Sequence, residues 1–525
     1  MASGNAASRY AALEPKRNAY LERARKCSAL TLPHLFPSLG ATETTVFETP
    51  YQGLGARGVN NLSSKLLLSL LPPNSPFFKM NLSENEMDQL QAMSGDQFKS
   101  VRTEIDKGLA KIEKRFMAWT EGVAIRPDVN EALKHLIVGG NVLCVVDEAD
   151  GIKNFRLDKY VVRRDPSGDV LEIVIKEPVD YDDLPPEVQA QVTNPSPNQA
   201  PQIKSEKYLY THVQYIGKKY EVYQEIDGKV IPSSKGSYLE DECPFLALRF
   251  TKVSGEDYGR SYVEEYYGDL KSLEGLTKAV VNSAAIVSKA VVFVRPGGVT
   301  SARKVAEAET GDVITGSMED VGLLQFEKWA DLRVAFEAIK TLEQRLAFAF
   351  LLNTAIQRPG ERVTAEEIRY MARELEDALG GTYSVLSQDF QVPFLKAGLA
   401  VLTRTSNQEW KLPKLPKGIN PIIVTGLEAL GRGHDLQKLD TWLSGAVQML
   451  GPQVMQRVNV EEYLARRALG LGIELDGLLV SQEELDAQQQ QAQMMEMVNR
   501  LGPNAVNQMG NLAKAGMDQQ QNVPQ

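Results

Sequence analysis

The feature that most constrains the fold is a pair of long helical patterns separated by a short stretch with a different period. Residues 259–291 contain no proline, and their apolar or small side chains recur at close to the helical period. At about 1.5 Å per residue, this first arm would be roughly 45–50 Å long. A second helical pattern covers residues 331–352. Its apolar residues fall on one stripe: Leu332, Phe336, Ile339, Leu342, Leu346 and Phe350. We therefore expect a hairpin of two long helices, packed arm against arm along this stripe.

The segment between the two arms has the character of strands and turns. Residues 291–294 are a β-branched and aromatic run that is stopped by Pro296 and two glycines. Further turn signals follow at 310–312 and 316–317, and residues 321–326 are compatible with a second strand. We expect a small β-containing tip on the hairpin.

The second arm leads into a loop that carries two arginines. Arg358 and Arg362 flank a Pro-Gly pair, which ends a helix and favours a tight turn. Thr364, with Glu367 three residues later, forms a capping box that opens the next helix.

This order of elements resembles a known family. Helix, β-rich insert, helix, loop and long helix correspond to stem, clip, stem, tunnel loop and wing helix in phage portal proteins. Residues 55–66, 258–266 and 355–367 resemble segments of the portals, or head-to-tail connectors, of short-tailed phages of the podovirus and autographivirus type. None of these segments is a catalytic signature, so the resemblance rests on their joint order. It covers nearly the whole chain and weakens in the C-terminal tail.

The resemblance implies an α+β, mainly helical fold and a division of the chain into parts. The expected parts are an N-terminal α+β wing (1–255), a first stem helix (256–291), a clip (292–327), a second stem helix (328–353), a tunnel loop (354–363), a kinked wing helix and its return (364–430), a helical crown (431–480) and a Gln/Met-rich C-terminal barrel or disordered tail (481–525).

Within the wing, residues 9–32, 51–71 and 87–119 show helical patterns, and strand patterns begin at residue 141. Gly53, Gly55 and Gly58 are spaced in a way that suggests a dinucleotide-binding loop. No strand is expected before them, and no acidic residue stands in the required later position. We therefore interpret these glycines as sites of close helix packing.

Composition limits the classes of function. The net charge of −10 over 525 residues argues against a general nucleic-acid binder. It suits a surface that DNA slides past, and equally an ordinary acidic soluble protein. The three cysteines lie far apart and form neither a disulfide framework nor a metal knuckle, which fits a reducing cytoplasm. The N-terminus lacks the apolar core of a signal peptide, and the apolar windows are too short or too polar to span a membrane.

The motifs of enzymatic chemistry are missing from the sequence. It contains no GxxxxGK[ST] phosphate cradle, no HExxH, no EF-hand loop and no GxSxG, and its four histidines are scattered. We expect no catalytic residues, no metal site and no cofactor.

The resemblance implies that the protein is a virion component at the head-to-tail junction, assembled in the host cytoplasm. It would form a homo-oligomeric ring of expected twelve-fold order at one capsid vertex, a channel for packaging and ejecting DNA. The implied partners are double-stranded DNA passing without sequence recognition, the terminase large subunit, a tail adaptor protein, scaffolding and major capsid proteins, and internal virion core proteins, with no membrane.

Within that picture, individual residues can be assigned expected roles. The candidates to meet DNA phosphates are Lys271, Lys278 and Lys289 on the stem, with Gln357, Arg358 and Arg362 on the loop. The three lysines could equally be solvated or form ion pairs between subunits, whereas for Arg358 and Arg362 we favour the position in the channel. The candidates to contact the adaptor are Val292, Arg295, Arg303, Lys304 and Asp312 of the clip. The small residues Ser283, Ala284 and Ala285 are candidates for close packing between subunits.

Two other classes of function remain open from the residues alone. The chain could be another head-tail structural protein, such as an adaptor or tail-tube component. It could also be a nucleic-acid enzyme whose site has no recognised motif. ATPase or nuclease activity would favour the enzyme, and a ring with a central hole would favour the portal.

Overall fold

The computed structural model describes residues 5–42, 44–73, 76–95, 98–179, 207–287, 291–309, 311–324, 329–352, 385–405, 422–425 and 432–451, with isolated residues within 370–381 and 453–467. The chain forms two compact units, Met1–Leu430 and Gly431–Gln525. Each unit is described by itself.

The first unit begins with helices, which are α1 (Ala6–Ala29), α2 (Leu54–Leu70), α3 (Glu84–Ser94), α4 (Phe98–Gly122) and α5 (Arg126–Gly139). Helix α3 starts at a capping box, in which the Ser83 hydroxyl accepts the Glu86 N–H and the Glu86 carboxylate accepts the Ser83 N–H. The prediction of a single helix over 87–119 is wrong, because the first helix ends at Gly95 and a second helix, α4, follows. This glycine has φ +51° and ψ −123°, a combination that is open to glycine and that ends the helix.

Two antiparallel sheets follow in the first unit. A three-stranded sheet has the order β3-β2-β9, and a five-stranded meander has the order β4-β5-β6-β7-β8. Their strands are β2 (Asn141–Asp147), β3 (Gly151–Phe155), β4 (Tyr160–Arg164), β5 (Val170–Val179), β6 (Lys207–Ile216), β7 (Lys219–Ile226), β8 (Lys229–Leu239) and β9 (Phe245–Arg249), with a 3₁₀ turn η3 (Glu240–Glu242) before β9. Strand β8 was not expected, because its proline, glycine and serines obscure the alternation of a strand.

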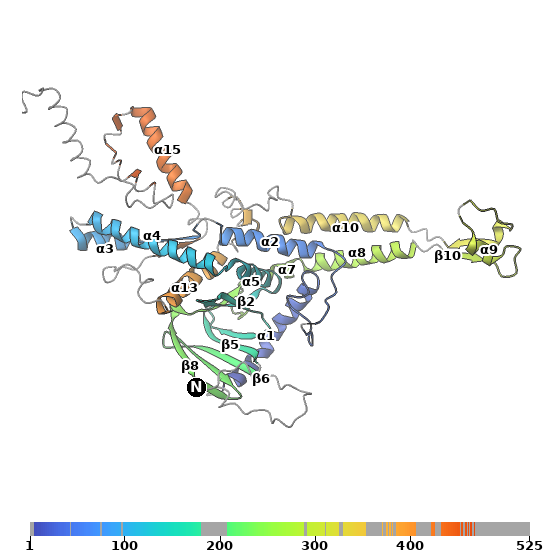
Figure 1. Cartoon of the computed structure of the whole chain (residues 1–525), viewed down its shortest axis with the longest axis horizontal. Helices are drawn as coiled ribbons and strands as arrows, with labels where there is room; N and C mark the ends of the chain where they lie inside the picture. Colours follow the sequence, from blue (N-terminus) through green and yellow to red (C-terminus); the bar gives the residue numbers. More distant parts are fainter. Residues whose placement is uncertain are drawn as a thin grey trace, which may run out of the picture. The chain divides into compact units, whose positions relative to one another are not determined.

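Helix α1 lies along the five-stranded sheet (Figure 1). A buried carboxylate of the sheet binds a side chain of α1. Glu172 of β5 accepts hydrogen bonds from Arg9 Nε of α1 at 2.8 Å and from Arg163 Nε of β4 at 3.2 Å. His212 Nε2 of β6 lies 2.9 Å from the same carboxylate. A buried carboxylate needs such partners, so this cluster holds three strands and α1 together.

The stem hairpin is confirmed. It consists of α7 (Tyr262–Glu265), α8 (Tyr267–Val287) and α10 (Trp329–Ala349), with α8 and α10 running alongside each other (Figure 1). The first arm starts later than its pattern suggests, because Arg260 is paired with Thr251 in a β-bridge. Ser261 then caps the helix by accepting the Glu264 N–H at 3.0 Å. The arm also breaks once, at Tyr266.

The clip elements lie in the sequence between α8 and α10. They are β10 (Val291–Val294), α9 (Ala302–Glu307), a 3₁₀ turn η4 (Met318–Asp320) and β11 (Val321–Leu324). Strands β10 and β11 pair antiparallel, with Val291 opposite Leu324. Both strands of the expected tip are therefore confirmed.

The remaining elements follow the stem. A π-helix η5 (Ser387–Gln391) runs directly into α13 (Val392–Thr405), and β12 (Ile422–Thr425) pairs with β1 (Phe78–Asn81). The π-helix has a local cause: Pro393 has no N–H, so the carbonyl of Asp389 cannot be paired in the ordinary i to i+4 way. The second unit contains α15 (Arg432–Leu450). The α+β, mainly helical class is confirmed.

One continuous core links the wing to the base of the stem. Fully buried members include Leu62 of α2, Phe116 of α4, Leu143 of β2, and Leu346 and Phe350 at the end of α10. Because these side chains pack in a single cluster, the stem base is part of the wing core and not a separate module.

Candidate functional site: the stem hairpin and the clip

The two arms of the stem are joined at their base by aromatic contacts. The Tyr262 hydroxyl donates to the Ala349 carbonyl at 2.8 Å, and the Tyr262 ring meets Phe350 edge-to-face with centroids 5.7 Å apart. Tyr266 also lies 6.0 Å from the Phe350 ring. Further out, Arg345 of α10 pairs with Asp269 of α8 at 2.9 Å. The early residues of one arm thus meet the late residues of the other, as in an antiparallel hairpin.

Helix α2 packs against the base of the stem. A Cβ added to Gly58 would lie 2.5 Å from Cγ of Phe350, so only glycine permits this approach. At Gly55, an added Cβ would lie 2.5 Å from the Leu30 carbonyl oxygen. The close-packing interpretation is confirmed at Gly55 and Gly58. It is wrong at Gly53, the residue before α2, where nothing lies within 4 Å of an added Cβ. Just before α2, the Glu274 carboxylate of α8 accepts the N–H groups of residues 51 and 52, each at 3.1 Å.

The apolar stripe of the stem is covered by its own chain only near the base. Leu346 and Phe350 are fully buried and Ile339 is partly buried, but Phe336, further out on the same stripe, is 56% exposed. The expected arm-against-arm packing therefore holds only for the inner part of the hairpin. An apolar helix face that continues beyond its own cover is typical of a surface that another molecule buries.

The small residues expected to pack between subunits lie in this outer part of α8. Ser283 is half-buried, while Ala284 and Ala285 are exposed. They are accessible in a single copy of the chain.

Only two of the six candidate DNA-contacting residues fall within the described residues. Lys271 is exposed on α8. Lys278 is also exposed, and its Nζ lies 5.6 Å from the centre of the Tyr51 ring. The other four, Lys289, Gln357, Arg358 and Arg362, lie outside the described residues.

The clip is held together by a residue that the sequence reasoning missed. Asp320 is buried and accepts the N–H of Val299 at 2.8 Å, the N–H of Thr300 at 3.1 Å and the Thr300 hydroxyl at 3.2 Å. A Cβ on Gly298 would lie 2.5 Å from the Asp320 carboxyl carbon. The only sequence signal was a short acidic side chain directly before a strand, where such side chains bind backbone N–H groups.

The five candidate adaptor contacts of the clip are all exposed. Arg303 pairs with Glu307 one turn later at 2.8 Å, and Asp312 accepts the Glu309 N–H at 2.8 Å. The other three are Val292, Arg295 and Lys304. Around them the large apolar side chains of Val299, Val313 and Met318 are also exposed.

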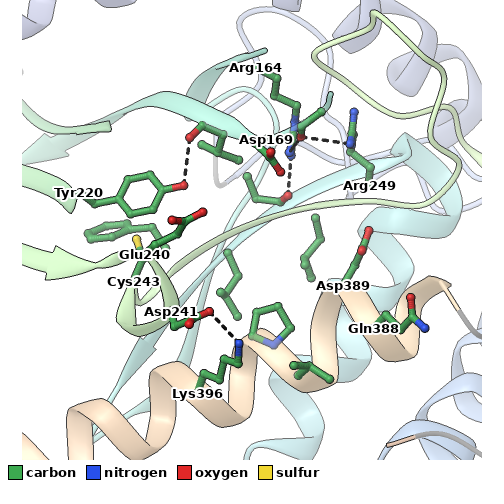
Figure 2. Close-up of a pocket in the computed structure, with 18 of the residues that line it drawn as sticks. Arg164, Asp169, Tyr220, Glu240, Asp241, Cys243, Arg249, Gln388, Asp389 and Lys396 are labelled. Atoms are coloured by element: carbon green, nitrogen blue, oxygen red, sulfur yellow. Dashed lines mark hydrogen bonds and ion pairs between the residues drawn. The ribbon is translucent and has the colours of Figure 1, made fainter. Parts of the chain in front are cut away.

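A cavity of about 290 Å³ lies in the wing between β9 and the helices η5 and α13 (Figure 2). Its charges are engaged in holding these elements together. Lys396 pairs with Asp241 at 2.7 Å, and the Arg164 guanidinium donates to the carbonyls of residues 168, 247 and 257. Burial raises the pKa of the Cys243 thiol to about 12, so it is no nucleophile at neutral pH. We interpret this cavity as structural.

There is no group of three or more His, Cys, Asp or Glu side chains in the described part of the chain that could hold a metal ion. None of the described helices combines the length and apolar character that a membrane crossing requires.

The family model for bacteriophage head to tail connecting protein matches residues 3–479. The chain belongs to this family. It is 39% identical to the portal protein of Escherichia phage T7, covering 95% of this chain and 92% of that one. It is 40% identical to the portal protein of Enterobacteria phage T3, covering 94% and 90% of the two chains. The portal protein of Pseudomonas phage phiKMV is 30% identical, with 90% and 91% covered.

The family predicted from the order of elements is thereby confirmed, and with it a place in the virion at the head-to-tail junction. Among solved structures, the neck of an empty gene transfer agent particle matches 81% of this chain and 90% of its own at 10% identity. The TM-score of 0.36 is too low to add to the family assignment.

Proposed function

We propose that this head-to-tail connecting protein is the portal of its phage, a closed ring at one capsid vertex through which DNA is packaged and ejected. The observation that carries the proposal is the outer stem, where the apolar stripe of α10 continues past the cover that its own chain provides. A ring of copies covers such a flank on every subunit, because each hairpin packs between two neighbours. Membership of the family and its portal relatives support the same function.

The small residues of α8 are proposed to lie at the contact between copies. Ser283, Ala284 and Ala285 let two helix backbones approach closely, and a dodecameric ring repeats that contact in every subunit. We expect no enzymatic activity, because the relatives that match most of the chain are portal proteins.

The remaining polar face of the stem and the loop after it are proposed to line the DNA channel. Lys271 is exposed and has no ion-pair partner among the described residues. Together with Lys278, Lys289 and the loop residues Gln357, Arg358 and Arg362, it would meet phosphate oxygens without reading bases. Such contacts must be weak and salt-sensitive, because a sliding duplex cannot be held by tight bonds at each step.

The clip is proposed to bind the terminase large subunit during packaging and the tail adaptor afterwards. Its exposed apolar side chains and its exposed charged residues provide a surface for protein partners. The wing would face the scaffolding and major capsid proteins, and the C-terminal part the internal virion core proteins.

The DNA role is tested by the double change Arg358→Ala, Arg362→Ala. We expect rings to form normally and the fraction of capsids that keep a full-length genome to fall, with a larger fall at high salt. The matched control removes two exposed charges of α4, Arg102→Ala with Lys107→Ala. Retention equal to that of the control at low and high salt would contradict the DNA role and leave the arginines as partners in ion pairs between subunits.

The clip role is tested by replacing residues 303–315 with a short Gly-Ser linker. Gly316 and Ser317 are kept, because the Ser317 N–H donates to the Thr300 hydroxyl at 2.8 Å and so helps to hold the clip. The variant should form rings and lose capture of the tail adaptor in a pull-down. Adaptor binding at unchanged affinity would remove residues 303–315 from that contact.

A further inference from the structure

The C-terminus of α10 ends in an unusual way. The Leu352 N–H donates to the Ala347 carbonyl at 2.8 Å, and the Leu351 N–H donates to the Phe348 carbonyl at 3.1 Å. This pair of bonds is a Schellman motif, which normally places glycine in the left-handed position. Here that position is Leu351, with φ +55°. A leucine keeps this conformation only where its surroundings hold it.

Helix α2 provides the groups that hold this end. The Asn61 side-chain amide donates to the carbonyls of Phe350 and Leu351, at 3.0 Å each. The Lys65 ammonium donates to the same Leu351 carbonyl at 3.1 Å. A positive charge is favourable at this end of a helix, where the last carbonyls carry partial negative charge. The two α2 side chains are one turn apart and so act on the same point of the chain.

Lys65 also contacts a residue that comes later in the sequence. Its Nζ lies 3.6 Å from Oε2 of Glu374, and the Lys65 side chain is buried. Burial lowers the pKa of Lys65, and the Glu374 carboxylate opposes that shift. Leu351 lies two residues before the segment 353–369, and Glu374 lies five residues after it. One ammonium group therefore contacts a residue before and a residue after the segment that carries Gln357, Arg358 and Arg362.

We propose that Lys65 is a positioning residue that clasps both ends of this segment to α2 and fixes where the loop begins and ends in every copy. The inference rests on the proposed function for its consequence, since the loop is proposed there to face DNA. The clasp itself depends only on the contacts of Lys65, Asn61, Leu351 and Glu374. With these contacts in every subunit, the segment 353–369 would begin at an equivalent position in each copy around the ring.

The test compares three lysine substitutions in the full-length protein. Lys65→Met keeps the length and apolar stem of the side chain and removes the ammonium. Lys65→Arg keeps the charge and its donors. Lys107→Met is the matched control, because Lys107 is an exposed lysine of α4. Hydrogen–deuterium exchange is measured on a peptide covering 346–352, which contains the two bonded amides of the Schellman motif, and on peptides from β6 and β7.

The expected result is that Lys65→Met speeds exchange of the Leu351 and Leu352 amides by about tenfold or more, since a hydrogen bond to a charged group is lost. Exchange in β6 and β7 should stay at the wild-type rate, Lys65→Arg should restore most of the protection, and Lys107→Met should change neither region. Unchanged protection at 351–352, or an equal rise everywhere, would overturn the clasp.

A second variant covers the case in which Lys65→Met does not fold. Glu374→Gln removes only the partner that comes later in the sequence, and it should speed exchange around residues 374–379 while residues 346–352 keep most of their protection. No change in that region would overturn the contact with both ends.

Genome retention then separates the clasp from the proposed function. Lys65→Met rings should lose packaged DNA as the arginine variant does. Faster exchange with wild-type retention would uphold the clasp as a structural contact and contradict the idea that it serves a DNA-facing loop.

Discussion

The packing of α2 against the stem predicts opposite effects for two glycine-to-alanine changes. In Gly58→Ala, the new Cβ would lie 2.5 Å from Cγ of Phe350 and 2.9 Å from its Cβ and Cδ1. The ring has little freedom to move, because Tyr262 and Tyr266 pack against it. In Gly275→Ala, on α8, nothing lies within 4 Å of the new Cβ.

The magnitudes follow from two terms. Alanine is favoured over glycine inside a helix by about 1 kcal/mol, and this gain applies to both sites. Overpacking a well-filled core costs ~1–3 kcal/mol, and this cost applies only at Gly58. Gly275→Ala should therefore raise the free energy of unfolding by about 1 kcal/mol, while Gly58→Ala should lower it by up to about 2 kcal/mol.

Equilibrium unfolding in urea at one fixed protein concentration measures the difference, since the stability of an oligomer depends on concentration. Phe350→Leu is combined with Gly58→Ala as a second variant, because it removes the aromatic ring that the new methyl group contacts. The double variant should then be more stable than the sum of the single changes predicts, by about 1 kcal/mol or more. If Gly58→Ala is as stable as Gly275→Ala, the close approach of α2 to the stem is wrong.

Three further outcomes are expected. Burial alone would raise the pKa of Glu172, but hydrogen bonds from Arg9, His212 and Arg163 hold this pKa well below 4.5. A carboxylate whose pKa is lowered in the folded state contributes stability that is complete above its unfolded pKa and is lost as the pH falls. Glu172→Gln should therefore lower the free energy of unfolding by about 3 kcal/mol at pH 7 and flatten the loss of stability below about pH 4.5. Equal acid sensitivity of variant and wild type would contradict this. Asp320→Ala should speed proteolysis within the clip and leave wing fragments intact, because Thr300 loses two acceptor contacts; an unchanged cleavage pattern would count against it. Ala284→Trp should block ring formation in size-exclusion chromatography with light scattering, and normal rings would show that this face is not packed.

Much of the stem could be predicted from the sequence because its signals are local. The period of apolar residues indicated both arms, and the β-branched run before the Pro-Gly-Gly stop indicated the first strand of the clip. The start of the first arm was placed too early, because the pairing of Arg260 with Thr251 depends on a strand edge that the helical pattern does not reveal. The break at Gly95 was missed because one glycine inside a long pattern is often tolerated.

The contacts that hold the site could not be predicted, since they join residues far apart in the chain. Lys65 and Leu351 are separated by 286 positions, and their contact exists only because α2 packs against the end of α10. Asn61 lies inside the helical pattern 51–71 and Leu351 inside the pattern 331–352, and neither pattern indicates a contact between them. Gly58 was interpreted correctly as a packing residue, but its partner, Phe350, became visible only in the fold.

The most direct test of the central claim is an electron cryomicroscopy reconstruction of the purified protein. The account predicts closed rings with a central hole, in which Phe336 and Ala284 are buried against neighbouring copies and Lys271 faces the hole. Monomers, open filaments, or rings that leave the outer stem exposed to solvent would contradict it.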